Sequence, residues 1–182
     1  MWTISLFLIV EPYYASEIAP TPEQNVIAQN VASLINDGDT IQFGIGSLPA
    51  ALGEALMDRH DLGIHSEMFS DAMARLMKAG VVTNQKKNFH PGLSICAFAW
   101  GSKWLYEYMD GNPLMRFLQV SYINALSAIA QNDNMVSVNS ALQIDLTGQV
   151  CSESLGSGSI PAQAELRTSP MERSIPRAEK AS

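Results

Sequence analysis

The sequence predicts an open α/β domain with a mostly parallel sheet and crossover helices. Short strand-like apolar segments alternate along the chain with segments whose apolar residues recur at helical spacing. Glycine, proline, serine and asparagine residues separate these segments. The 182 residues, 47% of them hydrophobic and 16% charged, suffice for one such domain and have the composition of a globular protein.

The first predicted helix begins after Thr21, which can cap it. Pro22 suits the first helical position, and Gln24 completes a capping box. Gly38 is predicted to end the helix in a left-handed conformation. Large aliphatic residues at helical spacing are predicted to form its apolar face, namely Ile27, Val31, Leu34 and Ile35.

A strand, a glycine turn and a second helix are predicted next. Residues 40–43 form the strand, and Gly44-Ile45-Gly46 follow it directly. Ser47 is predicted to cap a helix that ends near Met57, in whose first turn Pro49 is tolerated.

The remaining segments continue the alternation. Residues 62–66 are predicted to form a strand that precedes Glu67, and Ser70 to cap a helix that Gly80 closes. The unbroken apolar run 93–100 is typical of a strand buried on both faces. The later predicted elements are a helix at 103–109, a strand at 116–120, a helix at 125–131 and two strands within 135–146, on either side of Asn139-Ser140.

Charge and composition exclude several classes of function. A net charge of −7 and a pI near 4.8 argue against broad nucleic-acid binding. No segment approaches the roughly 20 apolar residues that span a bilayer. The apolar start lacks a basic region and a good cleavage site, so we expect a cytoplasmic protein rather than a secreted one, with a mitochondrial location open for a eukaryotic source. Cys96 and Cys151 have no CxxC-type partner, so we expect buried thiols and no metal site.

The turn Gly44-Ile45-Gly46 is the first candidate site. Two glycines after a strand expose backbone N–H groups near a helix N-terminus, where they suit an anion or a developing oxyanion. A GxGxxG dinucleotide motif is disfavoured because Pro49 replaces the third glycine. A purely structural tight turn, which requires positive φ, is the alternative.

Glu67 is the second candidate, because it lies just after a predicted strand and just before a capped helix. In open α/β sheets, ligands bind beyond the carboxyl ends of the strands. A carboxylate there can act as a nucleophile, or as an acid or base if burial raises its pKa. Taken alone, such a glutamate more often only bonds loop amides.

The combination resembles the acetyl-CoA hydrolase/transferase family. The stretches that carry the resemblance are DGDTIQFGIGSLPAAL, GIHSEMFSD, GVVTNQKKNFHPG, AFAWGSKWLYEYMDGNP and IAQNDNMVSVNSALQIDLTGQVCSESLG. The match runs from about residue 21 to 155 and is most similar to the butyrate and 4-hydroxybutyrate CoA-transferases. It implies the C-terminal domain of that family, with a fold of the NagB/RpiA/CoA-transferase type.

The resemblance implies acyl-CoA:carboxylate CoA transfer, with acyl-CoA hydrolysis as an alternative. It places the nucleophile on Glu67, which forms a glutamyl-CoA thioester, and the backbone oxyanion turn on Gly44 and Gly46. Ile45 and Ala72 join these glycines as candidate CoA-binding residues. Acyl-CoA and a short-chain carboxylate are the implied substrates, with no permanently bound cofactor and no metal.

The sequence departs from the family pattern in two places. Ala72 stands where the family has glycine. After Leu155 a Ser- and Pro-rich segment replaces the family's glycine-rich continuation. We therefore expect a truncated domain at residues 21–155, a segment outside the match at 1–20 and a disordered tail at 156–182. Such a chain is expected to form homo-oligomers or pair with a complementary chain, and a non-catalytic remnant or interaction subunit is a further alternative.

Other polar residues are interpreted structurally. His65 shares a strand face with Glu67 and can orient it, but a core histidine is favoured. Lys86, Lys87 and Lys103 can meet CoA phosphates, but ordinary solvated lysines are favoured.

Overall fold

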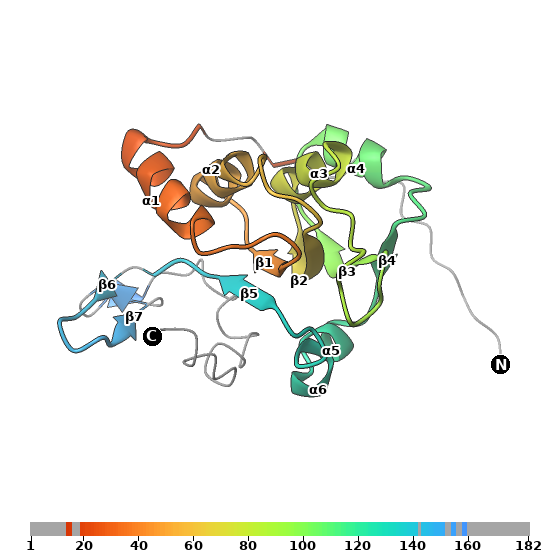
Figure 1. Cartoon of the computed structure of the whole chain (residues 1–182). Helices are drawn as coiled ribbons and strands as arrows, with labels where there is room; N and C mark the ends of the chain where they lie inside the picture. The colour runs from red at the N-terminus through yellow and green to blue at the C-terminus, as the bar shows by residue number, and fades with distance from the viewer. Residues whose placement is uncertain (1–13, 16–18, 142, 152–153, 156–157, 160–182) are drawn as a thin grey trace.

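The computed structural model describes residues 14–15, 19–141, 143–151, 154–155 and 158–159. Most of the predicted N-terminal segment and tail therefore lies outside the described residues. Five parallel strands form the main sheet in the order β4-β3-β2-β1-β5 (Figure 1). Their bounds are β1 Thr40–Phe43, β2 Gly63–Phe69, β3 Ser94–Ala99, β4 Met115–Phe117 and β5 Met135–Val138. The predicted open, parallel α/β architecture is confirmed.

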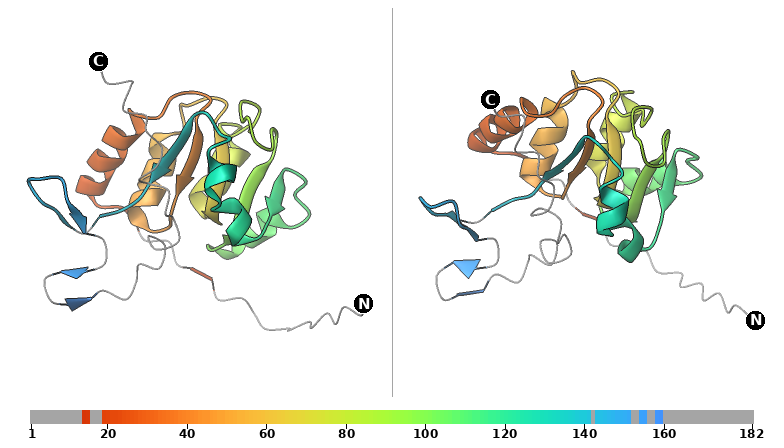
Figure 2. Two further views of the ribbon diagram at one scale, coloured as in Figure 1. Left: turned by 90° about the horizontal axis from the view of Figure 1, so that it is seen from below. Right: turned by 60° about the horizontal axis from the view of Figure 1, so that its bottom comes forward.

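Helices cover the two faces of the sheet unequally. Figures 1 and 2 show α1 to α4 on one face and α5 and α6 on the other. The helices are α1 Pro22–Ala32, α2 Ser47–Ala55, α3 Asp71–Lys78, α4 Lys103–Met109, α5 Val120–Ile123 and α6 Leu126–Ile129. The core lies between the sheet and the larger helical layer, where the fully buried residues include Phe43, Leu52, Ile64, Met73, Leu76 and Leu105. Within the described part of the chain, no helix is long and apolar enough to cross a membrane.

Two short hairpins follow the main sheet. β6 (Gln143–Ile144) pairs with β7 (Val150–Cys151), and β8 (Ser154–Leu155) pairs with β9 (Gly158–Ser159), both antiparallel. The two strands predicted within 135–146 therefore exist, but they belong to different sheets. Cys96 is buried as predicted, whereas Cys151 is only half-buried.

Helix α1 begins as predicted but packs differently. The Thr21–Gln24 capping box is present. The predicted apolar face is confirmed only in part. Ile35 is buried and Val31 packs partly buried against the core, but Ile27 and Leu34 are 46% and 76% exposed, and Ala28 and Ala32 are buried instead. The small alanine side chains let α1 approach its neighbour α2 closely. The helix also ends at Ala32, and Gly38 (φ +83°) forms the later turn into β1 instead of capping it.

Two further boundaries differ from prediction. β2 continues to Phe69, so Glu67 lies within the strand and not after it. β3 is buried only over its first half, since Phe98 is 41% exposed, and Trp100, directly after the strand, is 38% exposed. Short apolar runs identify strands well, but they do not show where covering helices end.

Lys87 is a buried structural residue, which corrects its interpretation as a solvated lysine. Its Nζ donates hydrogen bonds of 2.7 Å to the backbone oxygens of Ile64 and Leu93. Burial lowers the pKa of this ammonium to about 8, against the smaller opposing effect of Cys96. Gly63 lacks a Cβ that would overlap the Lys87 stem. Lys87 thus joins the starts of β2 and β3, while Lys86 and Lys103 are exposed as predicted.

Candidate active site

A pocket of about 590 Å³ lies beyond the carboxyl ends of β1, β2 and β3. Parallel α/β sheets place ligand sites at this edge. The turn after β1, the start of α3 and the residues after β3 all contribute to its wall. The lining includes Gly44, Ile45, Gly46, Ser70, Asp71, Ala72, Arg75, Trp100 and Gly101. Four predicted site residues therefore meet in this pocket, but Glu67 does not line it.

Within the glycine turn, Gly46 has a conformation that only glycine adopts easily. Gly46 has φ +110° and ψ −175° and is the N-cap of α2, where it replaces the predicted Ser47. A Cβ at Gly46 would meet no atom within 4 Å among the described residues, so the requirement is conformational and not spatial. Its carbonyl accepts a 3.0 Å hydrogen bond from Ala50 N, and its own lack of a side chain leaves α2 without a side-chain cap. The positive end of α2 consequently lies at the pocket wall.

Glu67 is half-buried and has a specific partner. Its Oε2 accepts a 2.6 Å hydrogen bond from Nδ2 of Asn124, which directly follows α5. The contact holds one carboxylate oxygen from the α5 side of the sheet. Sequence reasoning missed Asn124 because it lies 57 residues further along the chain and belongs to no recognisable local motif.

His65 is a core histidine, as favoured. It is 1% exposed, its Nε2 lies 2.9 Å from Ile123 O, and its ring lies 6.0 Å from that of Phe89. A carbonyl oxygen can only accept, so the neutral ring carries its proton on Nε2. Burial lowers the pKa of His65 to about 4, and Lys87 and His90 lower it further against the hydrogen bond to Ile123. His65 therefore supports α5 next to the contact between Asn124 and Glu67.

Lowering the pH should remove the contribution of neutral His65 to the stability of the fold. Its folded pKa of about 4 lies below the unfolded value of 6.5, so its stabilisation is fully present above pH 6.5 and is lost as the pH falls toward 4. The loss attributable to this group is roughly 3 kcal/mol. His65→Gln can still donate to Ile123 O but does not titrate. Urea unfolding at pH 7 and pH 4.5 should show a smaller loss for this variant, and an equal loss in both proteins would contradict the assignment.

Ala72 packs against a helix instead of blocking the pocket. It is the second residue of α3, where helical backbone suits alanine, and it is 6% exposed. A Cβ at Gly53 would lie 2.8 Å from its methyl group, so Gly53 of α2 allows the close contact. The methyl group of Ala72 is therefore accommodated by the close packing between α2 and α3.

Ser70 and Asp71 have different partners from those expected. Ser70 is the N-cap of α3 as predicted, but its hydroxyl makes no capping hydrogen bond. It is buried and has no hydrogen-bond partner among the described residues. Asp71 instead reaches α4, where its carboxylate accepts hydrogen bonds from Ser102 N (2.8 Å) and Ser102 Oγ (2.5 Å).

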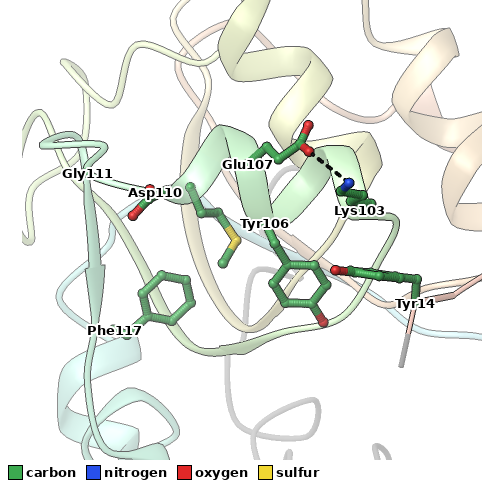
Figure 3. Close-up of a pocket in the computed structure, with 8 residues that line it drawn as sticks. Tyr14, Lys103, Tyr106, Glu107, Asp110, Gly111 and Phe117 are labelled. Atoms are coloured by element: carbon green, nitrogen blue, oxygen red, sulfur yellow. Dashed lines mark ion pairs between the residues drawn. The ribbon is translucent and has the colours of Figure 1, made fainter. Parts of the chain in front are cut away.

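A second, more open pocket of about 510 Å³ lies between α4 and β4 (Figure 3). The Tyr14 and Tyr106 rings meet there with centroids 5.8 Å apart, and Phe117 approaches from β4. Lys103 forms a 3.7 Å ion pair with Glu107 along the helix. The glycine turn, Glu67 and Ala72 all lie outside this pocket.

Comparison with known proteins identifies relatives over most of the chain. The chain matches the family described as the acetyl-CoA hydrolase/transferase C-terminal domain over residues 101–164. It is 50% identical over 133 residues to the 4-hydroxybutyrate coenzyme A transferase of Clostridium kluyveri, covering 73% of this chain and 31% of that protein. It is 37% identical over 140 residues to the butyryl-CoA:acetate CoA-transferase of Anaerostipes caccae, covering 76% and 31%.

Solved structures with related sequences have the same fold. RipA from Yersinia pestis superimposes with a TM-score of 0.75 at 42% identity, covering 78% of this chain and 33% of that one. A 4-hydroxybutyrate CoA-transferase from Porphyromonas gingivalis gives 0.70 at 44% identity, covering 74% and 35%. The fold is that of a CoA-transferase-like α/β domain. The chain belongs to the acetyl-CoA hydrolase/transferase family and spans about a third of the length of the curated relatives it matches.

Proposed function

We propose that this chain carries the nucleophile-bearing part of an acyl-CoA:carboxylate CoA-transferase of the acetate, butyrate or 4-hydroxybutyrate type. Glu67 is the proposed nucleophile. The observation that carries the proposal is its half-buried carboxylate, of which Asn124 holds one oxygen at 2.6 Å. Fixing one oxygen orients the other for attack without neutralising the charge. Relatives named as CoA-transferases support the reaction class.

The proposed reaction proceeds in two half-reactions. A Glu67 oxygen attacks the thioester carbonyl, the C–S bond breaks, and the CoA thiolate leaves behind an acyl-glutamyl anhydride. The thiolate then attacks the glutamyl carbonyl, which releases the acyl group as a carboxylate and leaves a glutamyl-CoA thioester. An acceptor carboxylate reverses these steps, takes the CoA and regenerates Glu67. The Gly44–Gly46 turn is proposed to present backbone N–H groups to the developing oxyanion.

Acyl-CoA hydrolysis is the second candidate, because the matched family description names both activities. In hydrolysis, water attacks the acyl-enzyme or glutamyl-CoA intermediate in place of the acceptor carboxylate. The two reactions share Glu67 and differ only in the final acceptor. They are therefore distinguished by whether CoA leaves as a free thiol.

Isotope exchange tests both candidates. The purified chain is incubated with butyryl-CoA and ¹³C-acetate, and the CoA species are separated by mass spectrometry. Transfer predicts labelled acetyl-CoA with little free CoA, whereas hydrolysis predicts free CoA whether or not acetate is present. A folded chain that produces neither would contradict the proposal.

A further inference from the structure

We propose that His65 is a positioning residue for the reaction at Glu67, because it holds α5 where the Asn124 amide reaches the Glu67 carboxylate. The inference rests on the proposed function, since it gives the core histidine a role in placing the proposed nucleophile. In this role His65 acts through α5 and does not act on the substrate.

The first observation is a pair of adjacent contacts between β2 and the end of α5. His65 Nε2 lies 2.9 Å from Ile123 O, and Glu67 Oε2 accepts a 2.6 Å hydrogen bond from Asn124 Nδ2. Residues two apart on a strand point to the same face and lie roughly 7 Å from each other. Two side chains on one face of β2 therefore hold two consecutive residues of the chain at α5.

The second observation is the shortness of α5, which cannot fix its own position. The helix has four residues, whereas isolated helices shorter than about 12 residues are only marginally stable. Its place is set by its contacts with β2 and β3, and Ile123 at its end is 1% exposed. Asn124 N donates a 2.9 Å hydrogen bond to Val120 O, so Asn124 moves with the helix. A shift of α5 would therefore carry the Asn124 amide away from Glu67.

The histidine ring has a single hydrogen bond to the described residues. Its Nδ1 is buried and has no partner among them, which leaves the contact between Nε2 and Ile123 O. A carbonyl oxygen accepts hydrogen bonds and cannot donate them, so Nε2 is the donor. Removing this donor would leave the buried Ile123 oxygen without it, and α5 would have to move to find another partner or water.

A second histidine contacts α5 at the surface and provides a comparison. His90 Nε2 lies 3.0 Å from the hydroxyl of Tyr122, which is 42% exposed. This contact joins the ends of two side chains, whereas His65 holds the backbone directly before Asn124. Water can replace the partner in an exposed hydrogen bond, so the surface contact should have little effect on the position of Asn124.

Substitutions at His65 and Tyr122 separate these contacts. His65→Gln can still donate to Ile123 O, whereas His65→Leu has no donor. His65→Asn keeps an amide but is too short to reach that oxygen, so it is the second loss-of-contact variant if the leucine chain does not fold. Tyr122→Phe removes the surface contact and keeps the ring that lies 6.0 Å from that of Phe89. Circular dichroism and urea unfolding identify the variants that fold.

The first measurement is the side-chain amide signal of Asn124 in the ¹⁵N-labelled full chain, assigned by its absence from Asn124→Ala. A short hydrogen bond to a carboxylate should shift this signal away from that of a solvated asparagine. The shift should persist in His65→Gln and Tyr122→Phe and be lost in His65→Leu and His65→Asn. An unchanged Asn124 signal in a folded loss-of-contact variant would overturn the inference.

The second measurement is the rate of CoA exchange. A loss-of-contact variant at His65 should lower kcat by about tenfold or more with little change in the KM for butyryl-CoA, because the nucleophile is displaced. His65→Gln and Tyr122→Phe should stay within a few-fold of the wild type. In the Asn124→Ala background the same change at His65 should cause no further loss, since His65 acts through Asn124. An equal loss of kcat in both backgrounds would contradict this pathway.

The two measurements distinguish this inference from the proposed function. A wild-type chain without CoA exchange, whose Asn124 signal still depends on His65, would refute the transferase proposal and leave His65 as the residue that positions Asn124. Exchange by the wild type, together with an Asn124 signal and a kcat that do not depend on His65, would refute the positioning role alone.

Discussion

Glu67→Gln should reduce the exchange of ¹³C-acetate into acetyl-CoA by at least about 10³-fold, because the amide cannot act as a nucleophile toward the thioester. The fold should be unaffected. The introduced glutamine side chain would still present an oxygen to Asn124 Nδ2, so the 2.6 Å hydrogen bond has an acceptor of the same shape. The measurement is the initial rate of labelled acetyl-CoA formation, with circular dichroism as the check on folding.

Two control variants test whether the loss of exchange depends on the position of the Glu67 carboxylate. Glu67→Asp keeps a carboxylate but draws it back by one methylene, so exchange should also fall steeply. Glu107→Gln removes an exposed carboxylate that lies outside the pocket beyond β1, β2 and β3 and should leave the rate within a few-fold of the wild type. Substantial exchange by Glu67→Gln would remove this residue from the mechanism.

Gly101→Ala should be the most destabilising of the simple glycine substitutions. A Cβ at Gly101 would overlap a carboxylate oxygen of Asp71 and a methyl group of the fully buried Leu105. Relief requires Asp71 to leave Ser102, which loses the charge-assisted contact between α3 and α4. Overpacking and the lost hydrogen bonds together should lower the free energy of unfolding by about 3 kcal/mol, measured by urea denaturation.

Gly80→Ala is the matched control for this prediction. Gly80 has φ +77°, and a Cβ there would meet no described atom within 4 Å. Backbone strain is then what opposes the added methyl group, so the cost should be about 1 kcal/mol. Equal losses in the two variants would show that the crowding between Gly101 and Asp71 does not control stability.

Local signals in the sequence predicted most of the fold. The Thr21–Gln24 capping box and the apolar run of β3 depend on neighbouring residues, and both appear in the structure. The packed face of α1 was predicted only in part, because its periodicity fits both the large aliphatic residues and the alanines that pack against α2. Only the proximity of α2 decides between them.

The site was harder to predict for the same reason. Motif and resemblance indicated Glu67 and the Gly44–Gly46 turn from short stretches of sequence. Asn124 and Lys87 act through contacts with residues 57 and 23 positions away, which no local pattern encodes. That the buried Ser70 hydroxyl has no hydrogen-bond partner among the described residues can be learned only from the structure.

The most direct test of the account is the mass of the peptide that contains Glu67 after the chain has reacted with butyryl-CoA. A glutamyl-CoA thioester adds the mass of CoA less one water to that peptide, and the addition should be absent from Glu67→Gln. The account predicts this adduct, at Glu67 and at no other carboxylate. A folded chain that carries CoA elsewhere, or that carries none, would contradict the assignment of Glu67 as the nucleophile.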